Sequence, residues 1–172
     1  MSGGKAMSLA GTGLARWAKM IGVFAIALHM SLAAFGNVTD YGTNWTFVQH
    51  VLAMDTTFNS PALMWRAIGD PVLQTAAYLA IIAAEIAGAA LTWWGLARLW
   101  QARRAEAEAF HAAKSLALFG LMWCFAIWVI GFIAIGGEWF AMWQSQTWNG
   151  QAGATRFAAV TGIAMLFLAI RE

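Results

Sequence analysis

The sequence predicts an all-α membrane protein, with four transmembrane helices in a bundle and short amphipathic helices in the first outer loop. Composition is the first reason: 61% of the 172 residues are hydrophobic and only 10% are charged, against about 25% charged residues in a soluble domain. Length is the second, because the chain has room for about four apolar spans and for no separate soluble domain.

The stretch from Pro71 to Arg98 is the clearest predicted span. Between Asp70 and Arg98 it carries a single charge, Glu85, near its middle, and its length of about 40 Å exceeds a hydrocarbon layer of about 30 Å. Its polar and small residues recur at helical spacing and share one face. They are Gln74, Tyr78, Glu85, Gly88, Thr92 and Gly95. An acidic side chain at this depth is costly against lipid, so we expect this face to meet other helices.

The chain before this span divides into three parts. Residues 1–15 are rich in Gly, Ser and Ala and are predicted to form a flexible cytoplasmic tail, ahead of a single transmembrane domain over 16–172. The first span covers about 18–36. The outer loop 37–70 is too polar to span, and its amphipathic run from Asn44 and its Ser60-Pro61 helix start predict two short helices. We expect these on the membrane surface or over the mouth of the bundle.

The remaining spans are predicted at about 71–98, 113–136 and 152–171, with a second outer loop over 137–151. Small residues of the third span fall on one face, which favours close helix packing; they are Ala117, Gly120, Cys124 and Gly131. The last apolar run is short, so its helix is expected to begin near Ala152 with Arg156 reaching outward.

Basic residues predict the orientation. Eight lie on one side of the predicted spans, and Arg66 and Arg156 lie on the other. The eight are Lys5, Arg16, Lys19, Arg98, Arg103, Arg104, Lys114 and Arg171. By the positive-inside rule both termini are cytoplasmic and the two Trp-rich loops face outward.

Three segments resemble a known family. They are NVTDYGTNWTFVQHVLAMDTTF (Asn37–Phe58), ALMWRAI (Ala62–Ile68) and GGEWFAMWQSQTWNGQ (Gly136–Gln151). They closely resemble a bacterial family of predicted small integral membrane proteins, domain-of-unknown-function family 2165, and the resemblance runs from about Arg16 to Arg171. It implies a multi-pass protein of the bacterial inner (cytoplasmic) membrane with four spans. It implies no activity and draws attention to the outer loops.

An intramembrane polar site is predicted at Glu85, His29, Tyr78 and Thr92. Counted from Lys19 and Arg98, His29 and Glu85 lie within roughly 5 Å of each other in depth. A buried carboxylate and imidazole in contact would serve as a proton relay or ligand site. The alternative, which we favour, is an interhelical hydrogen bond that fixes helix register, worth roughly 0.6–2 kcal/mol.

The outer loops predict an interaction surface. Its members are Trp45, His50, Asp55, Trp65, Arg66, Glu138, Trp139, Trp143 and Trp148. Tryptophans near membrane interfaces form anchoring belts. The second loop, however, places more large apolar side chains together than anchoring requires, which favours association with a partner.

Catalysis and cofactor binding are not expected. Nucleophile elbows, phosphate loops and Cys pairs are absent from the sequence, and the spacing of His50, Asp55 and Asp40 matches no metal motif. The three histidines differ in predicted depth, so no haem ligand pair is apparent. We therefore predict no enzyme activity, no cofactor and no metal. With a net charge of +2 and basic residues beside apolar segments, we also predict no nucleic-acid partner.

Two functional hypotheses follow. The leading one is a non-enzymatic accessory or scaffold subunit, in contact with the lipid bilayer, that associates with a membrane-protein partner or with itself through its Trp-rich periplasmic loops. The alternative is a small transporter or a lipid- or quinone-binding protein that uses a midplane site at Glu85 and His29. The sequence names neither the partner nor the ligand.

Overall fold

The computed structural model describes residues 3–171, with side chains from residue 13 onward. The long elements are α1 (Gly3–Thr39), α3 (Pro71–Ala102), α4 (Ala107–Ala126), its continuation η2 (Ile127–Trp139) and α5 (Gln151–Ala169). The short ones are α2 (Tyr41–Ala53), η1 (Met64–Arg66) and η3 (Met142–Gln144).

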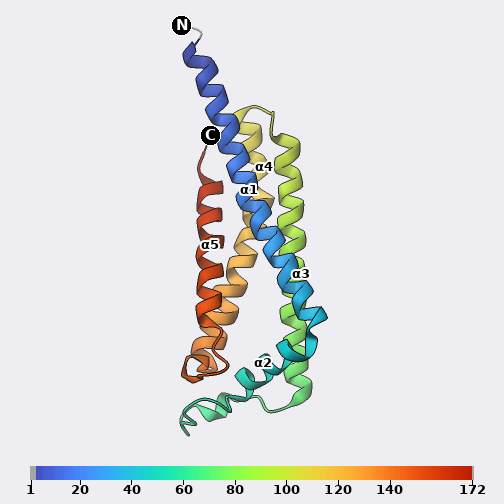
Figure 1. The fold of residues 1–172 in the computed structure, drawn as a ribbon, viewed down its shortest axis with the longest axis vertical. Helices are drawn as coiled ribbons and strands as arrows, with labels where there is room; N and C mark the ends of the chain where they lie inside the picture. The colour runs from blue at the N-terminus through green and yellow to red at the C-terminus, as the bar shows by residue number, and fades with distance from the viewer. Residues whose placement is uncertain (1–2, 172) are drawn as a thin grey trace.

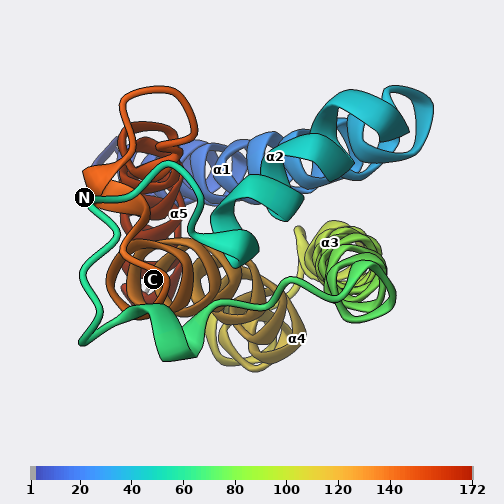
Figure 2. The same ribbon diagram turned by 90° about the horizontal axis from the view of Figure 1, so that it is seen from below.

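The long helices form a bundle (Figure 1). Within the described residues, four helices are long and apolar enough to cross a membrane: Gly13–Thr39, Pro71–Ala102, Ala107–Trp139 and Gln151–Ala169. The predicted fold class is therefore confirmed. We call the end that holds the start of α1 and the end of α5 the terminal end. The opposite end, where α2 lies across the bundle (Figures 1 and 2), is the loop end.

Close contact between α3 and α4 organises the bundle. The polar stripe of α3, including Gln74, Tyr78 and Glu85, is buried as predicted. A Cβ added at Gly95 would collide with the backbone of Ala117, and one added at Gly120 would lie 2.8 Å from the Thr92 nitrogen. The small residues of both helices thus let the two backbones approach, as small-residue interfaces do in membranes.

Basic side chains hold the terminal end together. Arg16 donates from Nη1 to the carbonyl oxygens of Arg103 (3.1 Å) and Ala105 (2.7 Å), just after α3. Lys19 and Lys114 both donate from Nζ to the Ile170 oxygen, at 2.6 and 2.8 Å. Cations therefore satisfy carbonyl groups that the ends of α3 and α5 leave without helical partners.

The loop end is closed by two segments that we call the cap, residues 41–70 and 140–150. The Asp70 side chain accepts hydrogen bonds from the backbone of Val72 and Leu73, and Pro71 occupies the first turn of α3, so the helix begins where Pro71 predicts. The Ile68 amide donates to the Leu52 oxygen at 2.8 Å, which fastens the end of the first cap segment beneath α2.

Three boundaries differ from the predictions. α1 continues to Thr39, so Asn37 belongs to the first helix and not to the outer loop. The second short helix of that loop is a single 3₁₀ turn, Met64–Arg66. Residues 1–15, predicted as a flexible tail, begin outside the described residues; their backbone from Gly3 belongs to α1, and their mobility stays a prediction.

Candidate functional site

A hydrogen-bond network joins α1 and α3 around Glu85, which is 1% exposed. Asn37 Nδ2 donates to Glu85 Oε2 at 2.7 Å. Tyr78 donates from its hydroxyl to the Asn37 carbonyl oxygen at 2.7 Å. Because that carbonyl lies in the last turn of α1, it has no partner further along the helix. Glu85 therefore faces the interior and is paired, and the same network ties the end of α1 to α3.

The expected proximity of His29 and Glu85 does not occur. The His29 ring stacks on Phe157 of α5, with centroids 4.1 Å apart, and lies 5.8 Å from the Trp128 ring. Asn37, which reaches Glu85, stands eight residues and so about 12 Å of helix rise beyond His29. The depth estimate failed because it placed Lys19 and Arg98 at one level. In the structure the Arg16 side chain contacts Arg103 and Ala105, beyond the end of α3.

Thr92 is also separate from Glu85. Its hydroxyl donates to the Gly88 oxygen at 2.7 Å and lies 3.5 Å from Cys124 Sγ. It therefore contributes to α3–α4 packing. Of the four predicted intramembrane residues, the structure brings together only Glu85 and Tyr78.

Two adjoining cavities, which we together call the crevice, lie beneath α2, and Glu85 borders one of them. Its first part, the polar chamber, is a cavity of about 370 Å³ between α1 and α5 that is lined by Asn37, Asn44, Tyr78, Glu85 and Trp128 among others. Its second part, the apolar chamber, is a cavity of about 440 Å³ between α2, α3 and η2. The two chambers share lining residues, namely Phe47, Val48, Ile81 and Phe132.

The wall from α4 changes its backbone hydrogen bonding at this crevice. From Ile127 the helix continues in the wider π form to Trp139, and the amide of Phe140 donates to the Ile135 oxygen, five residues back, at 3.0 Å. Wide turns of this kind are rare and are often found at functional sites. Here the segment lines both chambers.

The cap joins the two outer loops into one unit. Phe58 donates from its amide to Gln144 Oε1 at 2.9 Å, and Thr56 donates from its hydroxyl to Ser145 Oγ at 2.8 Å. His50 Nδ1 lies 2.8 Å from Asp55 Oδ2, and the His50 ring stacks on Trp148 at 4.6 Å.

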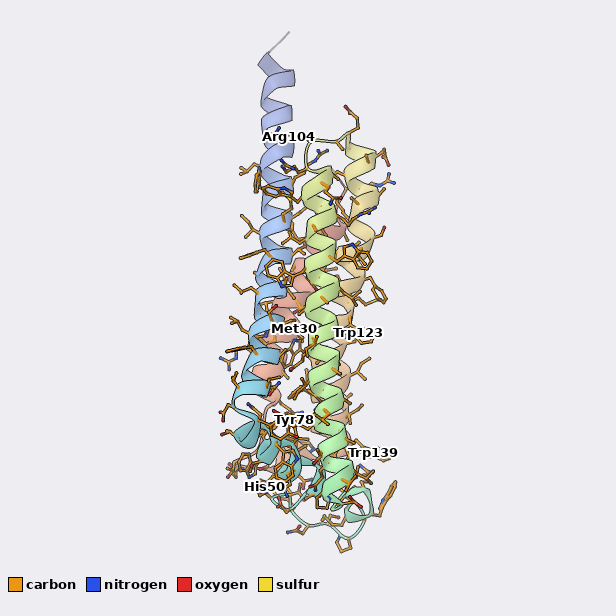
Figure 3. The ribbon with its side chains drawn as sticks, turned by 90° about the vertical axis from the view of Figure 1, so that its right-hand side faces the viewer. Met30, His50, Tyr78, Arg104, Trp123 and Trp139 are labelled. Atoms are coloured by element: carbon orange, nitrogen blue, oxygen red, sulfur yellow. The ribbon has the colours of Figure 1, made fainter. Side chains whose placement is uncertain are left out.

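Several predicted loop residues cluster where the end of η2 meets the outside of the cap. Trp65 and Trp139 meet edge to face with centroids 5.6 Å apart. The Arg66 guanidinium lies 4.8 Å from the Trp139 ring centroid. Trp65 is 69% exposed and Trp139 is 46% exposed. We call these three residues the Trp65 cluster; Figure 3 shows Trp139 at the loop end.

The other predicted loop residues are distributed around this cluster. Trp143 is exposed and meets Phe58 edge to face at 5.9 Å. Trp45 turns inward and donates from Nε1 to Thr75 Oγ1 at 3.1 Å, and Glu138 is exposed. Among the described residues, no three His, Cys, Asp or Glu side chains are grouped so that they could hold a metal ion.

These features define a multi-pass integral membrane protein with a polar network inside the bundle. The model of the family described as predicted small integral membrane protein (DUF2165) matches residues 15–171, and the chain belongs to this family. No curated protein and no solved structure matches the chain.

Sequence reasoning missed two residues of the site, Asn37 and Trp128. The polar neighbours of Asn37 predict a place in the outer loop. Trp128 is buried among His29, Phe132 and Phe157, with its ring centroid 5.1 Å from Phe132 and 5.0 Å from Phe157. Its position away from both predicted interfaces was the available signal, because tryptophan in membrane helices prefers the interface.

Proposed function

We propose that the protein is a non-enzymatic accessory or scaffold subunit of the bacterial inner membrane that associates through its cap, with itself or with a larger membrane complex. The observation that carries this proposal is the exposed Trp65 cluster. Trp and Arg are enriched in protein interfaces and among the residues that contribute most binding energy. An exposed tryptophan pair stacked with an arginine offers such an anchor.

The fastening of the cap also supports association. Hydrogen bonds between the loops, such as Phe58 to Gln144, hold the surface in one shape before a partner arrives. A surface that is already ordered loses less conformational entropy on binding than a mobile loop does.

Purification tests this proposal with a matched pair of variants. The double variant Trp65→Ala, Trp139→Ala removes the cluster, and Trp94→Ala, Trp100→Ala removes two exposed tryptophans of α3 at its terminal-end portion. In native gels after extraction in a mild detergent, the cap variant should lose a partner or oligomer that the wild type and the α3 variant retain. A wild type that runs as a lone monomer, or a cap variant that keeps its association, would contradict the proposal.

We further propose that both termini are cytoplasmic and that the cap is periplasmic. The arginine and lysine contacts at the terminal end support this orientation through the positive-inside rule. In a Cys124→Ala background, an impermeant thiol reagent applied to intact spheroplasts should label Gln146→Cys and not Arg104→Cys, both exposed positions. The reverse labelling pattern would overturn the orientation.

A second candidate function is favoured by a separate observation, the crevice that borders Glu85. A small transporter or a lipid- or quinone-binding protein would use such a cavity. Its polar site would be the network of Asn37, Tyr78 and Glu85, and not the predicted pair of Glu85 and His29. Its first test is whether a membrane lipid binds the wild type and whether a substitution that fills the crevice abolishes this binding.

A further inference from the structure

We infer that the crevice beneath α2 binds an uncharged membrane amphiphile with a hydroxyl-bearing head and one long hydrocarbon chain. The inference rests on the second candidate function and names its ligand class. The head occupies the polar chamber, beside Glu85, and the chain occupies the apolar chamber.

Unused hydrogen-bonding capacity in the polar chamber indicates the head group. A carboxylate offers about four acceptor sites on its two oxygens, and among the described side chains Glu85 accepts one hydrogen bond, from Asn37. Trp128 lines the same chamber, and its Nε1 is buried without a hydrogen-bond partner among the described residues. A hydroxyl group both donates and accepts, so it matches an acceptor and a donor together.

The charge of the chamber excludes an anionic head. Its lining contains no Lys, Arg or His side chain, and its one carboxyl group is that of Glu85. A phosphate placed there would find no cation to offset its charge, which is unfavourable in a low-dielectric site. An ammonium head donates hydrogen bonds but cannot accept one, so it would leave the Trp128 indole without a partner. The head is therefore uncharged.

The apolar chamber accounts for the hydrocarbon chain. All of its lining residues are apolar or glycine, so a polar group in it would find no side-chain partner. Each chamber lies within the range of about 300–1,000 Å³ that is typical of ligand sites. Leu32, which lines the polar chamber, and Ile135, which lines the apolar one, are both exposed on spanning segments. The ligand thus enters from the bilayer.

Four probes test the ligand class on delipidated full-length protein by native mass spectrometry. They are 1-monooleoylglycerol, a quinol with one long chain, methyl oleate and dioleoylphosphatidylglycerol. The two uncharged hydroxyl-bearing probes, 1-monooleoylglycerol and the quinol, should bind about tenfold more tightly than methyl oleate, which has no donor for Glu85. The tighter of these two identifies whether the head is a glycerol or an aromatic diol.

Two variants locate the binding. Trp128→Phe keeps the aromatic shape and removes the indole donor, so 1-monooleoylglycerol should bind about fivefold more weakly. Gly131→Leu fills the apolar chamber, and nothing lies within 4 Å of a Cβ added there, so it should abolish binding. Gly42→Leu, equally free of neighbours and outside both chambers, is the matched control and should bind as the wild type does.

The outcomes separate the inference from the function on which it rests. Equal binding of methyl oleate, or preference for the anionic lipid, with loss in Gly131→Leu, would overturn the ligand class and leave a lipid-binding crevice. If no probe binds, or if Gly131→Leu binds as well as Gly42→Leu, the second candidate function fails as well.

Discussion

The α3–α4 interface and the crevice beneath α2 use glycine in opposite ways. At the interface, the absence of a side chain lets backbones touch: Gly95 stands against Ala117, and Gly120 against Thr92. At the crevice, Gly131 and Gly153 line the chambers, and a Cβ at either would meet nothing within 4 Å. Small residues therefore stabilise the α3–α4 interface by close contact, whereas at the crevice they leave room.

The largest effect is expected from the same substitution made in both regions. Gly95→Leu forces a side chain into the backbone of Ala117 and should lower the free energy of unfolding by at least about 3 kcal/mol, because overpacking a close interface is costly. Gly131→Leu should change it by less than about 0.5 kcal/mol. Thermal unfolding in detergent measures both, and equal losses would remove the distinction between the regions.

A second expected effect concerns the carboxylate. Glu85→Leu leaves the half-buried Asn37 amide without its acceptor, which should cost about 1–3 kcal/mol, whereas Glu85→Gln retains an acceptor oxygen and should cost less than about 1 kcal/mol. Chemical unfolding of the two variants checks the difference. Similar losses in both would mean that the negative charge, and not the hydrogen bond, stabilises the end of α1.

A smaller effect is expected from the tyrosine hydroxyl. Tyr78→Phe removes the donor to the Asn37 carbonyl oxygen and should cost about 1 kcal/mol. Tyr41→Phe is the control, because the Tyr41 ring lies 4.9 Å from the Tyr78 ring and the same hydroxyl is removed nearby. Unchanged stability in Tyr78→Phe would show that this bond does not hold α1 to α3.

Helical spacing in the sequence was enough to predict the packing faces of α3 and α4, although not that these two faces pack against each other. The stripe that includes Gly88, Thr92 and Gly95 and the small-residue face that includes Ala117 and Gly120 are periodic along each helix, and periodicity is a local property. The crevice was not predictable in this way. It depends on where α1 ends, and Asn37 has the same polarity whether it lies in a last helical turn or in a loop.

Relative depth was the other quantity that the sequence did not provide. The register of α1 against α3 follows from tertiary contacts such as Arg16 to Ala105 and Asn37 to Glu85, which join residues far apart in the chain. The wide backbone hydrogen bonding from Ile127 onward likewise has no periodic signal. Glu85 could therefore be identified as buried, but its partner could not.

Native mass spectrometry of protein extracted from its own membrane, without added lipid, tests most directly whether the crevice beneath α2 holds a bound ligand. Wild type and Gly42→Leu should carry an uncharged, hydroxyl-bearing amphiphile at close to one molecule per chain, and Gly131→Leu should carry none. A wild type free of such a molecule, or equal occupancy in Gly131→Leu, would contradict the assignment of the crevice as a binding site.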